Sequence, residues 1–138
     1  MSTSFVRVAD VMRRSLHTVN GLASVQHALE QMGRERVSSL VVERRDDDDE
    51  YGVITVHEIA AEVVSANRSA KRTSVYQVMT KPALTLPADM NVKYAIRLLS
   101  RFGLTRALVT QGRKLEGLVT LRDLVLSGAD FGEDDEAS

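Results

Sequence analysis

The sequence predicts an α+β protein made of two tandem β-α-β-β-α repeats, packed sheet to sheet about a pseudo-twofold axis. Three observations support this fold class. The sequence matches itself at an offset of 67 residues in its first part and of 65 in its later part. Each copy alternates helical and extended periodicities. Each copy also ends in a glycine, two apolar residues and a threonine, with an acidic residue three positions further on. A copy of about 55 residues would bury too little surface alone, so we expect the two copies to share a core.

The composition fits this fold and excludes several protein classes. The chain has 138 residues, of which 43% are hydrophobic and 4% aromatic, so we expect an aliphatic core. No stretch approaches 18 consecutive apolar residues, and the start lacks a basic region followed by an apolar run. We therefore expect neither a membrane span nor a signal peptide, and a cytoplasmic location. Cysteine is absent, which excludes disulfides and thiolate metal sites.

The charges are unevenly spread. The net charge is −1, but residues 46–50 carry five negative charges and residues 133–136 carry four. The rest of the chain therefore carries +8. A basic body suits an anionic ligand. We expect the run at 46–50 to be a solvated hairpin tip, because contiguous carboxylates lack the alternating spacing of a calcium loop.

Each copy opens with a short helical turn followed by an amphipathic helix. Apolar residues at 8, 11 and 12 and again at 75, 78 and 79 have helical spacing, and an extended piece follows near 16–19 in the first copy. The next apolar stripes have i, i+3, i+4, i+7 spacing. Ser24 is the expected N-cap of the first helix, and Asn91 or Asp89 that of the second. The stripe residues are Val25, Ala28, Leu29 and Met32 in the first copy and Val92, Ala95, Ile96 and Leu99 in the second.

A β-hairpin and a final helix complete each copy. Unbroken apolar runs at 40–42 and 107–109 predict strands covered on both faces. The loops at 43–51 and 110–116 differ by two residues, which explains the change of offset. The glycine-led strands follow, and helices begin at Thr55 and Thr120. We therefore place the first repeat at 8–66, a linker at 67–74, the second repeat at 75–128 and an acidic disordered tail at 129–138.

The threonine and the acid that follows it have two interpretations. Thr-x-x-acid at a helix start is a capping arrangement, in which the hydroxyl accepts a backbone N–H and the carboxylate lies near the positive end of the helix dipole. The same geometry also suits an anionic ligand.

The duplicated Val-x-x-Val-Met opening, the strands Ser-Ser-Leu-Val-Val and Thr-Arg-Ala-Leu-Val, and the two Gly-h-h-Thr-x-x-acid segments together resemble the CBS domain pair, or Bateman module. The resemblance covers about residues 8–128. It implies a regulatory module that binds adenine nucleotides (AMP, ADP or ATP) or sometimes S-adenosylmethionine. It also implies a homodimer that acts on a regulated partner protein.

The resemblance also implies two ligand sites. In the first, Thr120 and Arg122 with Arg106 would contact phosphate, and Asp123 would hold the ribose hydroxyls. Its base pocket would be lined by Val37, Ser38 and the segment from Met12 to His17. The second site would use Thr55, His57, Glu58, Leu104, Thr105 and the segment 79–84, which includes Lys81.

The second site departs from the family pattern, because Glu58 stands where the family usually has aspartate. The four residues from Thr55 to Glu58 also form a complete capping box. We expect Glu58 to act mainly as a cap and Asp123 mainly as a ligand contact, and the opposite roles stay open.

The remaining motifs favour no other chemistry. The three histidines, His17, His27 and His57, are scattered without metal-ligand spacing. No nucleophile–base pair stands out, so we expect no enzyme and no metal site. The paired arginines lack aromatic platforms, so we do not expect nucleic-acid binding. The leading hypothesis is a stand-alone sensor of an adenine nucleotide, and the alternative is a dimerisation module with empty clefts.

Overall fold

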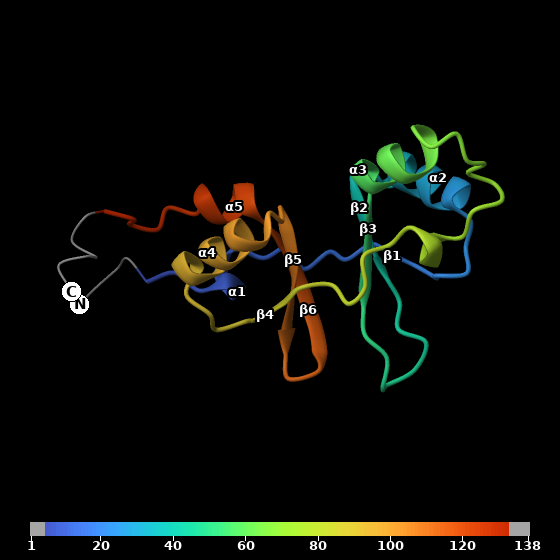
Figure 1. Cartoon of the computed structure of the whole chain (residues 1–138). Coiled ribbons are helices and arrows are strands. Elements are labelled where there is room, and N and C mark those ends of the chain that lie inside the picture. Colours follow the sequence, from blue (N-terminus) through green and yellow to red (C-terminus); the bar gives the residue numbers. More distant parts are fainter. Residues whose placement is uncertain (1–4, 133–138) are drawn as a thin grey trace. The chain divides into compact units, whose positions relative to one another are not determined.

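In the computed structural model, which describes residues 5–132, the chain folds into two compact units. The N-terminal unit is Leu16–Ala83. The C-terminal unit joins Met1–Ser15 to Leu84–Ser138 (Figure 1). The predicted α+β class and the two repeated sheets are confirmed, whereas the packing of one sheet on the other stays a prediction.

The N-terminal unit contains a three-stranded sheet in the order β1-β2-β3. Strand β1 pairs parallel with β2, and β2 pairs antiparallel with β3. The parallel pair needs a crossover, which a helix provides. The elements are β1 (Thr18–Val19), α2 (Val25–Glu35), β2 (Ser39–Val42), β3 (Gly52–Thr55), α3 (Val56–Ile59), the π-helical turn η1 (Ala60–Val64) and the 3-10 turn η2 (Val75–Gln77).

The C-terminal unit repeats this plan with the strand order β4-β5-β6. The two strands of its hairpin are longer, and their pairing carries an irregularity between Val109 and Thr110. The elements are α1 (Val8–Val11), β4 (Thr85–Pro87), α4 (Val92–Phe102), β5 (Arg106–Gln111), β6 (Lys114–Thr120) and α5 (Leu121–Val125).

Local chemistry sets the ends of the two long helices. The Ser24 hydroxyl accepts the His27 N–H at 3.0 Å, and the Asn91 side chain accepts the Lys93 N–H at 2.9 Å. Ser24 is thus confirmed as a cap, and Asn91 rather than Asp89 caps α4. Both helices end at a residue in the left-handed conformation, Arg36 with φ 58° and Gly103 with φ 64°.

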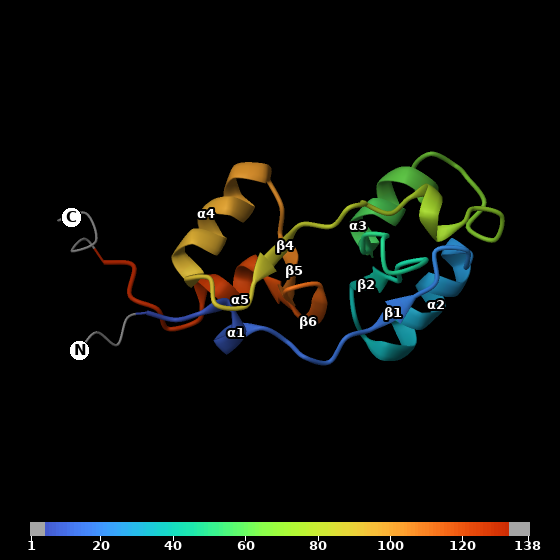
Figure 2. The same ribbon diagram turned by 90° about the horizontal axis from the view of Figure 1, so that it is seen from below.

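The predicted apolar stripes face the sheets. The stripe of α2 lies in one buried aliphatic cluster and that of α4 in another. In two perpendicular views, α4 and α5 lie on the same side of the β5–β6 hairpin, and α2 lies to one side of β2 and β3 (Figures 1 and 2). Each sheet therefore has a helix-covered apolar face, which keeps the strand ends in register.

The opening turns pack with the opposite repeat. Val8 of α1 is fully buried in the core of the C-terminal unit, and Val75 and Val78 lie in the core of the N-terminal unit. The compact units therefore differ from the sequence repeats, in which each turn was placed with the copy that follows it. The cause is that the apolar side of each turn is buried against the other copy's sheet.

The segment expected to be a linker is hydrogen-bonded to α2. The carbonyls of Ala70 and Thr73 accept the N–H groups of Gln26 and Val25 at 3.0 and 2.8 Å. The first N–H groups of a helix have no partner inside it, so these bonds satisfy two of them.

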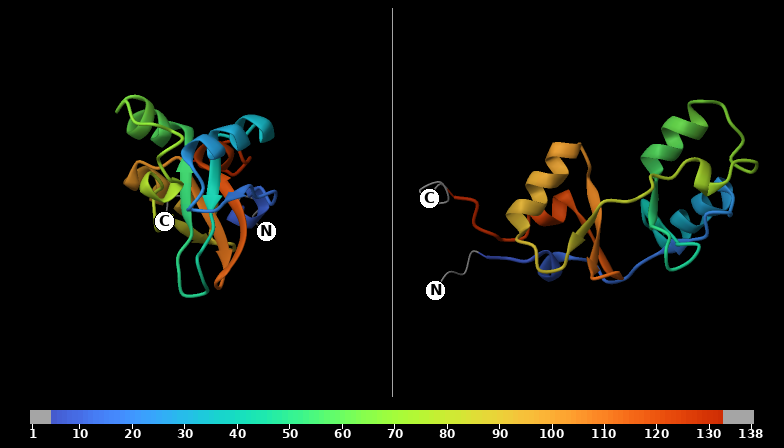
Figure 3. Two further views of the ribbon diagram at one scale, coloured as in Figure 1. Left: turned by 90° about the vertical axis from the view of Figure 1, so that its right-hand side faces the viewer. Right: turned by 60° about the horizontal axis from the view of Figure 1, so that its bottom comes forward.

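The loop of the β2–β3 hairpin extends beyond its strands (Figure 3). Asp46, Asp47 and Asp48 are exposed, as expected for a solvated tip. Asp49 is different, because its side chain is only 8% exposed and its carboxylate pairs with Lys81 at 2.7 Å. The prediction of a wholly solvated tip is therefore wrong at Asp49.

The chain termini are described in part. Ala129 packs against the core of the C-terminal unit. Residues 133–138 of the predicted tail and residues 1–4, where a leader was not expected, lie outside the described residues. No helix among residues 5–132 is long and apolar enough to cross a bilayer.

Candidate functional site

Two threonine-capped helices carry the predicted site residues. The Thr120 hydroxyl accepts the Asp123 N–H at 3.0 Å, and the Thr55 hydroxyl accepts the Glu58 N–H at 3.1 Å. Both caps predicted from the Thr-x-x-acid motif are therefore confirmed. The two acidic side chains that follow these threonines behave differently.

The carboxylate of Asp123 contacts two arginine side chains. Its Oδ2 accepts a hydrogen bond from Arg13 Nε at 2.9 Å, and Arg122 Nη1 lies 4.0 Å from its Oδ1. The Asp123 side chain is 21% exposed, so its carboxylate can be reached from solvent. The site thus presents an accessible carboxylate beside two guanidinium groups.

These contacts keep the carboxylate ionised. The hydrogen bond from Arg13, assisted by its charge, lowers the pKa of Asp123, and partial burial opposes this only in part. An ionised carboxylate only accepts hydrogen bonds, and it can accept several. At neutral pH the group is ready to bind hydroxyl or amine donors.

Gly117 explains why Arg13 reaches this position. Arg13 forms a one-residue antiparallel bridge with Leu118 of β6, through bonds of 2.8 and 3.0 Å. A Cβ atom at Gly117 would lie 2.7 Å from the Arg13 carbonyl oxygen and 2.8 Å from Met12 Sδ. Only glycine lets the opening segment cross β6 so closely. Arg13 lies in the segment from Met12 to His17 that was expected to line the base pocket, but its contact with Asp123 was not predicted.

Other predicted residues lie beside Thr120. Arg106 pairs with Thr120 in the β5–β6 register, and the carbonyl of Thr105 accepts the Leu121 N–H at 2.7 Å. Leu104 and Met12 pack against the core of the same unit. The C-terminal unit by itself therefore brings together the part of the opening segment that contains Arg13 and the residues Thr105, Arg106, Thr120, Arg122 and Asp123.

Glu58 is engaged by its own unit. Its Oε1 accepts the Thr55 N–H at 2.9 Å, which completes the predicted capping box, and its Oε2 accepts the Thr80 hydroxyl. Both carboxylate oxygens are thus in use. Thr80 is bridged to Val53 of β3 in the way that Arg13 is bridged to Leu118.

The remaining residues assigned to ligand clefts lie in the N-terminal unit. The Ser38 carbonyl accepts the Val56 N–H at 3.0 Å, so Ser38 flanks Thr55, and Val37 packs against the core of this unit. His57 is exposed, and His17 Nδ1 lies 2.8 Å from Glu35 Oε1. The contribution of Val37, Ser38 and His17 to the Asp123 site stays a prediction.

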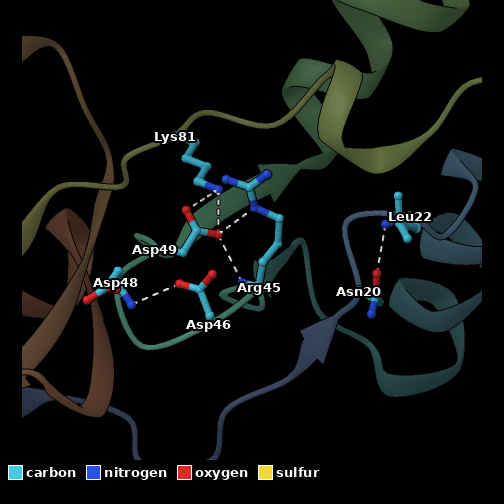
Figure 4. Close-up of polar contacts among 7 residues, drawn as sticks. All are labelled: Asn20, Leu22, Arg45, Asp46, Asp48, Asp49 and Lys81. Atoms are coloured by element: carbon cyan, nitrogen blue, oxygen red, sulfur yellow. Dashed lines mark hydrogen bonds and ion pairs between the residues drawn. The ribbon is translucent and has the colours of Figure 1, made fainter.

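Lys81 was expected near a phosphate beside Thr55. Its Nζ lies 2.7 Å from Asp49 Oδ1, which holds it at the hairpin loop (Figure 4). Among the described residues, no group of three or more His, Cys, Asp or Glu side chains could hold a metal ion.

Comparison with known proteins matches most of the chain. The family model of the CBS domain matches twice, at residues 8–65 and 75–129. An uncharacterised protein of Methanopyrus kandleri is 27% identical over 121 residues, which are 87% of this chain and 61% of that protein. The chain therefore spans about three fifths of that relative. Protein YlbB of Bacillus subtilis, also uncharacterised, is 26% identical, over 88% of this chain and 81% of its own length.

Solved structures share the fold. A hexameric CBS-CP12 protein from bloom-forming cyanobacteria superposes with a TM-score of 0.87 at 30% identity, covering 92% of this chain and 70% of that one. A CBS-domain protein of unknown function from Thermoplasma acidophilum superposes with a TM-score of 0.79, also at 30% identity, over 88% of this chain and 68% of its own. The similarity thus includes both repeats.

Proposed function

Because the chain belongs to the CBS-domain family, whose members are generally regulatory rather than catalytic, we propose that it is a regulatory module that binds an adenine nucleotide (AMP, ADP or ATP) at Asp123. The observation that supports this most strongly is the ionised, accessible carboxylate of Asp123 beside Arg13 and Arg122.

The chemistry of this site matches a sugar phosphate. A carboxylate accepts two hydrogen bonds from the vicinal hydroxyls of ribose. Arginine is suited to phosphate, because its planar guanidinium donates two parallel hydrogen bonds. Arg122 is largely exposed, and Arg106 lies opposite Thr120. A ligand that carries both groups can use the carboxylate and the arginines together.

Arg13 is the positioning residue of this proposal. Its bond to Oδ2 fixes the direction of the carboxylate, whose side chain is 21% exposed, and Arg122 Nη1 lies 4.0 Å from Oδ1. A ribose diol can therefore approach Oδ1 directly and share Oδ2 with Arg13. The free energy of binding is larger when the acceptor is held in place beforehand.

The regulatory effect needs a difference in affinity. A nucleotide changes the conformation or the self-association of the module only if it binds one state more tightly than the other. We propose that the chain self-associates as a homodimer and conveys this change to a partner protein.

The second function is a dimerisation module with empty clefts. The observation in its favour is Glu58, whose two carboxylate oxygens are both occupied inside its own unit. For the Thr55 site this interpretation is the better one. We therefore place nucleotide binding at Asp123 and a capping role at Glu58.

Thermal unfolding distinguishes the two functions. The full chain is melted alone and with AMP, ADP, ATP or S-adenosylmethionine, and the Asp123→Asn variant is melted in parallel. At 100 times its Kd a ligand stabilises the protein by about 2.7 kcal/mol, which raises Tm by several degrees. The proposal requires a shift with an adenine nucleotide that the variant loses. An unchanged Tm with every compound would support the scaffold function.

A further inference from the structure

The N-terminal unit has a pocket that the proposed nucleotide site does not use. Its volume is about 610 Å³, and a small organic molecule needs about 300–1,000 Å³. It lies where β1 and β2 end and the hairpin loop begins, whereas the threonine cap lies at the other end of β3. The polar part of its lining comes from Asn20, Glu43, Arg44, Arg45 and Lys81.

Most of the polar side chains in this pocket offer hydrogen-bond donors. The arginines and the lysine have no acceptor atoms. The side-chain oxygen of Asn20 accepts the Leu22 N–H at 2.8 Å, so the NH₂ group is what this amide still offers. The exception is Glu43, and its Oε2 accepts the Thr18 hydroxyl at 3.3 Å. A matching ligand must therefore be rich in acceptors.

Asp49 holds two of the cations in place. It accepts hydrogen bonds from Lys81 Nζ at 2.8 Å, Arg45 Nε at 3.2 Å and the Arg45 N–H at 2.9 Å (Figure 4). Asp49 uses only the Nε of the Arg45 side chain. Among residues 5–132, the two terminal nitrogens of Arg45 make no hydrogen bond or ion pair. The Arg45 side chain is 82% exposed, so a ligand can reach them. These nitrogens are held near Lys81 and are free to donate.

The rest of the lining is apolar. Leu22 and Tyr76 are 80% and 52% exposed at the pocket, and Met79 and the buried Val42 complete this wall. Backbone bonds fix the wall, because the Gly21 carbonyl accepts the Tyr76 N–H at 3.0 Å. The exposed ring of Tyr76 offers a flat face for a planar group.

We propose that this pocket binds a small organic phosphate, with its phosphate at Arg45 and Lys81 and its apolar part against Tyr76 and Leu22. Donors that approach from two elements of the chain suit a tetrahedral group with three oxygens better than a planar carboxylate with two. Asp123 is not among the residues that line this pocket, so the pocket would give the chain a second ligand site.

The test is a titration of the full ¹⁵N-labelled chain with phenyl phosphate, followed by backbone amide NMR. Benzoate replaces the phosphate by a carboxylate, phenol removes the charge, and inorganic phosphate removes the ring. The proposal requires saturable shifts at the amides of residues 20–22, 43–45, 76 and 79–81, with phenyl phosphate binding more tightly than the other three. Shifts confined to Thr120–Asp123, or none at these amides, would overturn it.

Three variants make the test specific. Arg45→Gln should weaken phenyl phosphate binding by about tenfold, because a charge-assisted hydrogen bond is lost. The single variant Lys81→Met should weaken phenyl phosphate binding more than Arg45→Gln does. Its amide spectrum shows whether this variant is folded. The matched control is Lys71→Met, which removes an exposed lysine of the same unit that does not line the pocket. Equal affinity for Arg45→Gln and Lys71→Met would also overturn the proposal.

One further variant separates this site from the nucleotide site. Asp123→Asn should bind phenyl phosphate as tightly as the unchanged chain, and Arg45→Gln should keep any stabilisation by AMP. If Asp123→Asn alone abolished phenyl phosphate binding, the phosphate would bind at the Asp123 site and the proposed pocket would be wrong.

Discussion

The two cap carboxylates occupy equivalent positions in the repeats and have different partners. Asp123 receives its hydrogen bond from the Arg13 side chain, whereas Glu58 binds the backbone of its own cap and the Thr80 hydroxyl. Arg13 and Thr80 are themselves equivalent, since each follows the Val-x-x-Val-Met opening and bridges the strand before the cap. The longer glutamate reaches back to the backbone N–H of its own cap, whereas the shorter aspartate is bonded by the Arg13 side chain and stays 21% exposed.

The next position along the chain shows the same divergence. Arg14 lies 3.7 Å from Glu116 in the C-terminal unit, and Lys81 lies 2.7 Å from Asp49 in the N-terminal unit. In both units a basic residue of the opening segment pairs with an acidic residue of the hairpin. The first hairpin is two residues longer and its acid lies further from the strand glycine, but the pairing of base and acid is present in both units.

The largest expected effect is on the stabilisation by AMP, when aspartate and glutamate are interchanged at positions 123 and 58. Asp123→Glu should complete a capping box with Thr120 and withdraw the carboxylate from the ligand. We expect the stabilisation by AMP, about 2.7 kcal/mol at 100 times its Kd, to fall by more than half. Glu58→Asp is the matched variant and should leave the AMP effect unchanged. The measurement is the shift of Tm with AMP, and an unaltered shift in Asp123→Glu would remove the distinction between the two sites.

Alanine in place of the two strand glycines should affect stability unequally. At Gly117 a Cβ atom would lie 2.7 Å from a backbone oxygen, whereas at Gly52 its closest neighbour is Met79 Sδ at 2.9 Å. A flexible side chain can move aside more easily than backbone. We expect Gly117→Ala to lower the free energy of unfolding by about 2–3 kcal/mol and Gly52→Ala by about 1 kcal/mol. Urea unfolding measures both, and equal losses would contradict the close crossing at Gly117.

Removing the two cap hydroxyls should show that Glu58 is structural. Thr120→Ala should cost about 1 kcal/mol, because one helix N–H loses its acceptor. Thr55→Ala should cost more, up to about 2 kcal/mol, since Glu58 loses a contact at 3.3 Å as well. Urea unfolding measures the loss in free energy of unfolding for each variant, and the expected result is a larger loss for Thr55→Ala. A larger loss at Thr120 would mean that the box at Thr55 adds nothing.

The smallest effect is the pH dependence of the Arg13–Asp123 pair. Because the pKa of Asp123 is lowered in the folded state, its stabilising effect is complete above the ordinary aspartate pKa of about 3.9 and is lost as the pH falls through the folded value. Arg13 is largely exposed, so we expect Arg13→Gln to cost only about 0.5 kcal/mol at neutral pH. The difference from the unchanged chain should shrink below about pH 4. A difference that grew with acidity would reverse the assigned role of Arg13.

Most of the fold could be predicted from the sequence, because its signals are local. The stripes of the two long helices, the Ser24 cap and the two threonine caps each depend on residues within one or two turns. The packing of each opening turn in the core of the other repeat could not be predicted in this way. Residues 8–12 have the same pattern wherever they pack, and only the folded chain shows which sheet buries them.

The threonines and acids of the two helix caps could be predicted from the sequence, but the partners of the acidic side chains could not. Arg13 lies 110 residues from Asp123, and Lys81 lies 32 residues from Asp49, so no local pattern links them. The acidic run at 46–50 indicated solvent exposure as a whole, which concealed the one aspartate that pairs inside the unit. The glycine of the Gly-h-h-Thr motif was a usable signal, since a close backbone crossing requires it.

The most direct measurement compares the affinities of AMP and 2′-deoxy-AMP for the full chain by isothermal titration calorimetry. If Asp123 accepts hydrogen bonds from both ribose hydroxyls, the deoxy form should bind more weakly by about 1–3 kcal/mol, because a carboxylate oxygen loses its donor. The same comparison in Asp123→Asn should show little difference between the two nucleotides. Equal affinities for AMP and 2′-deoxy-AMP in the unchanged chain would contradict the role assigned to Asp123.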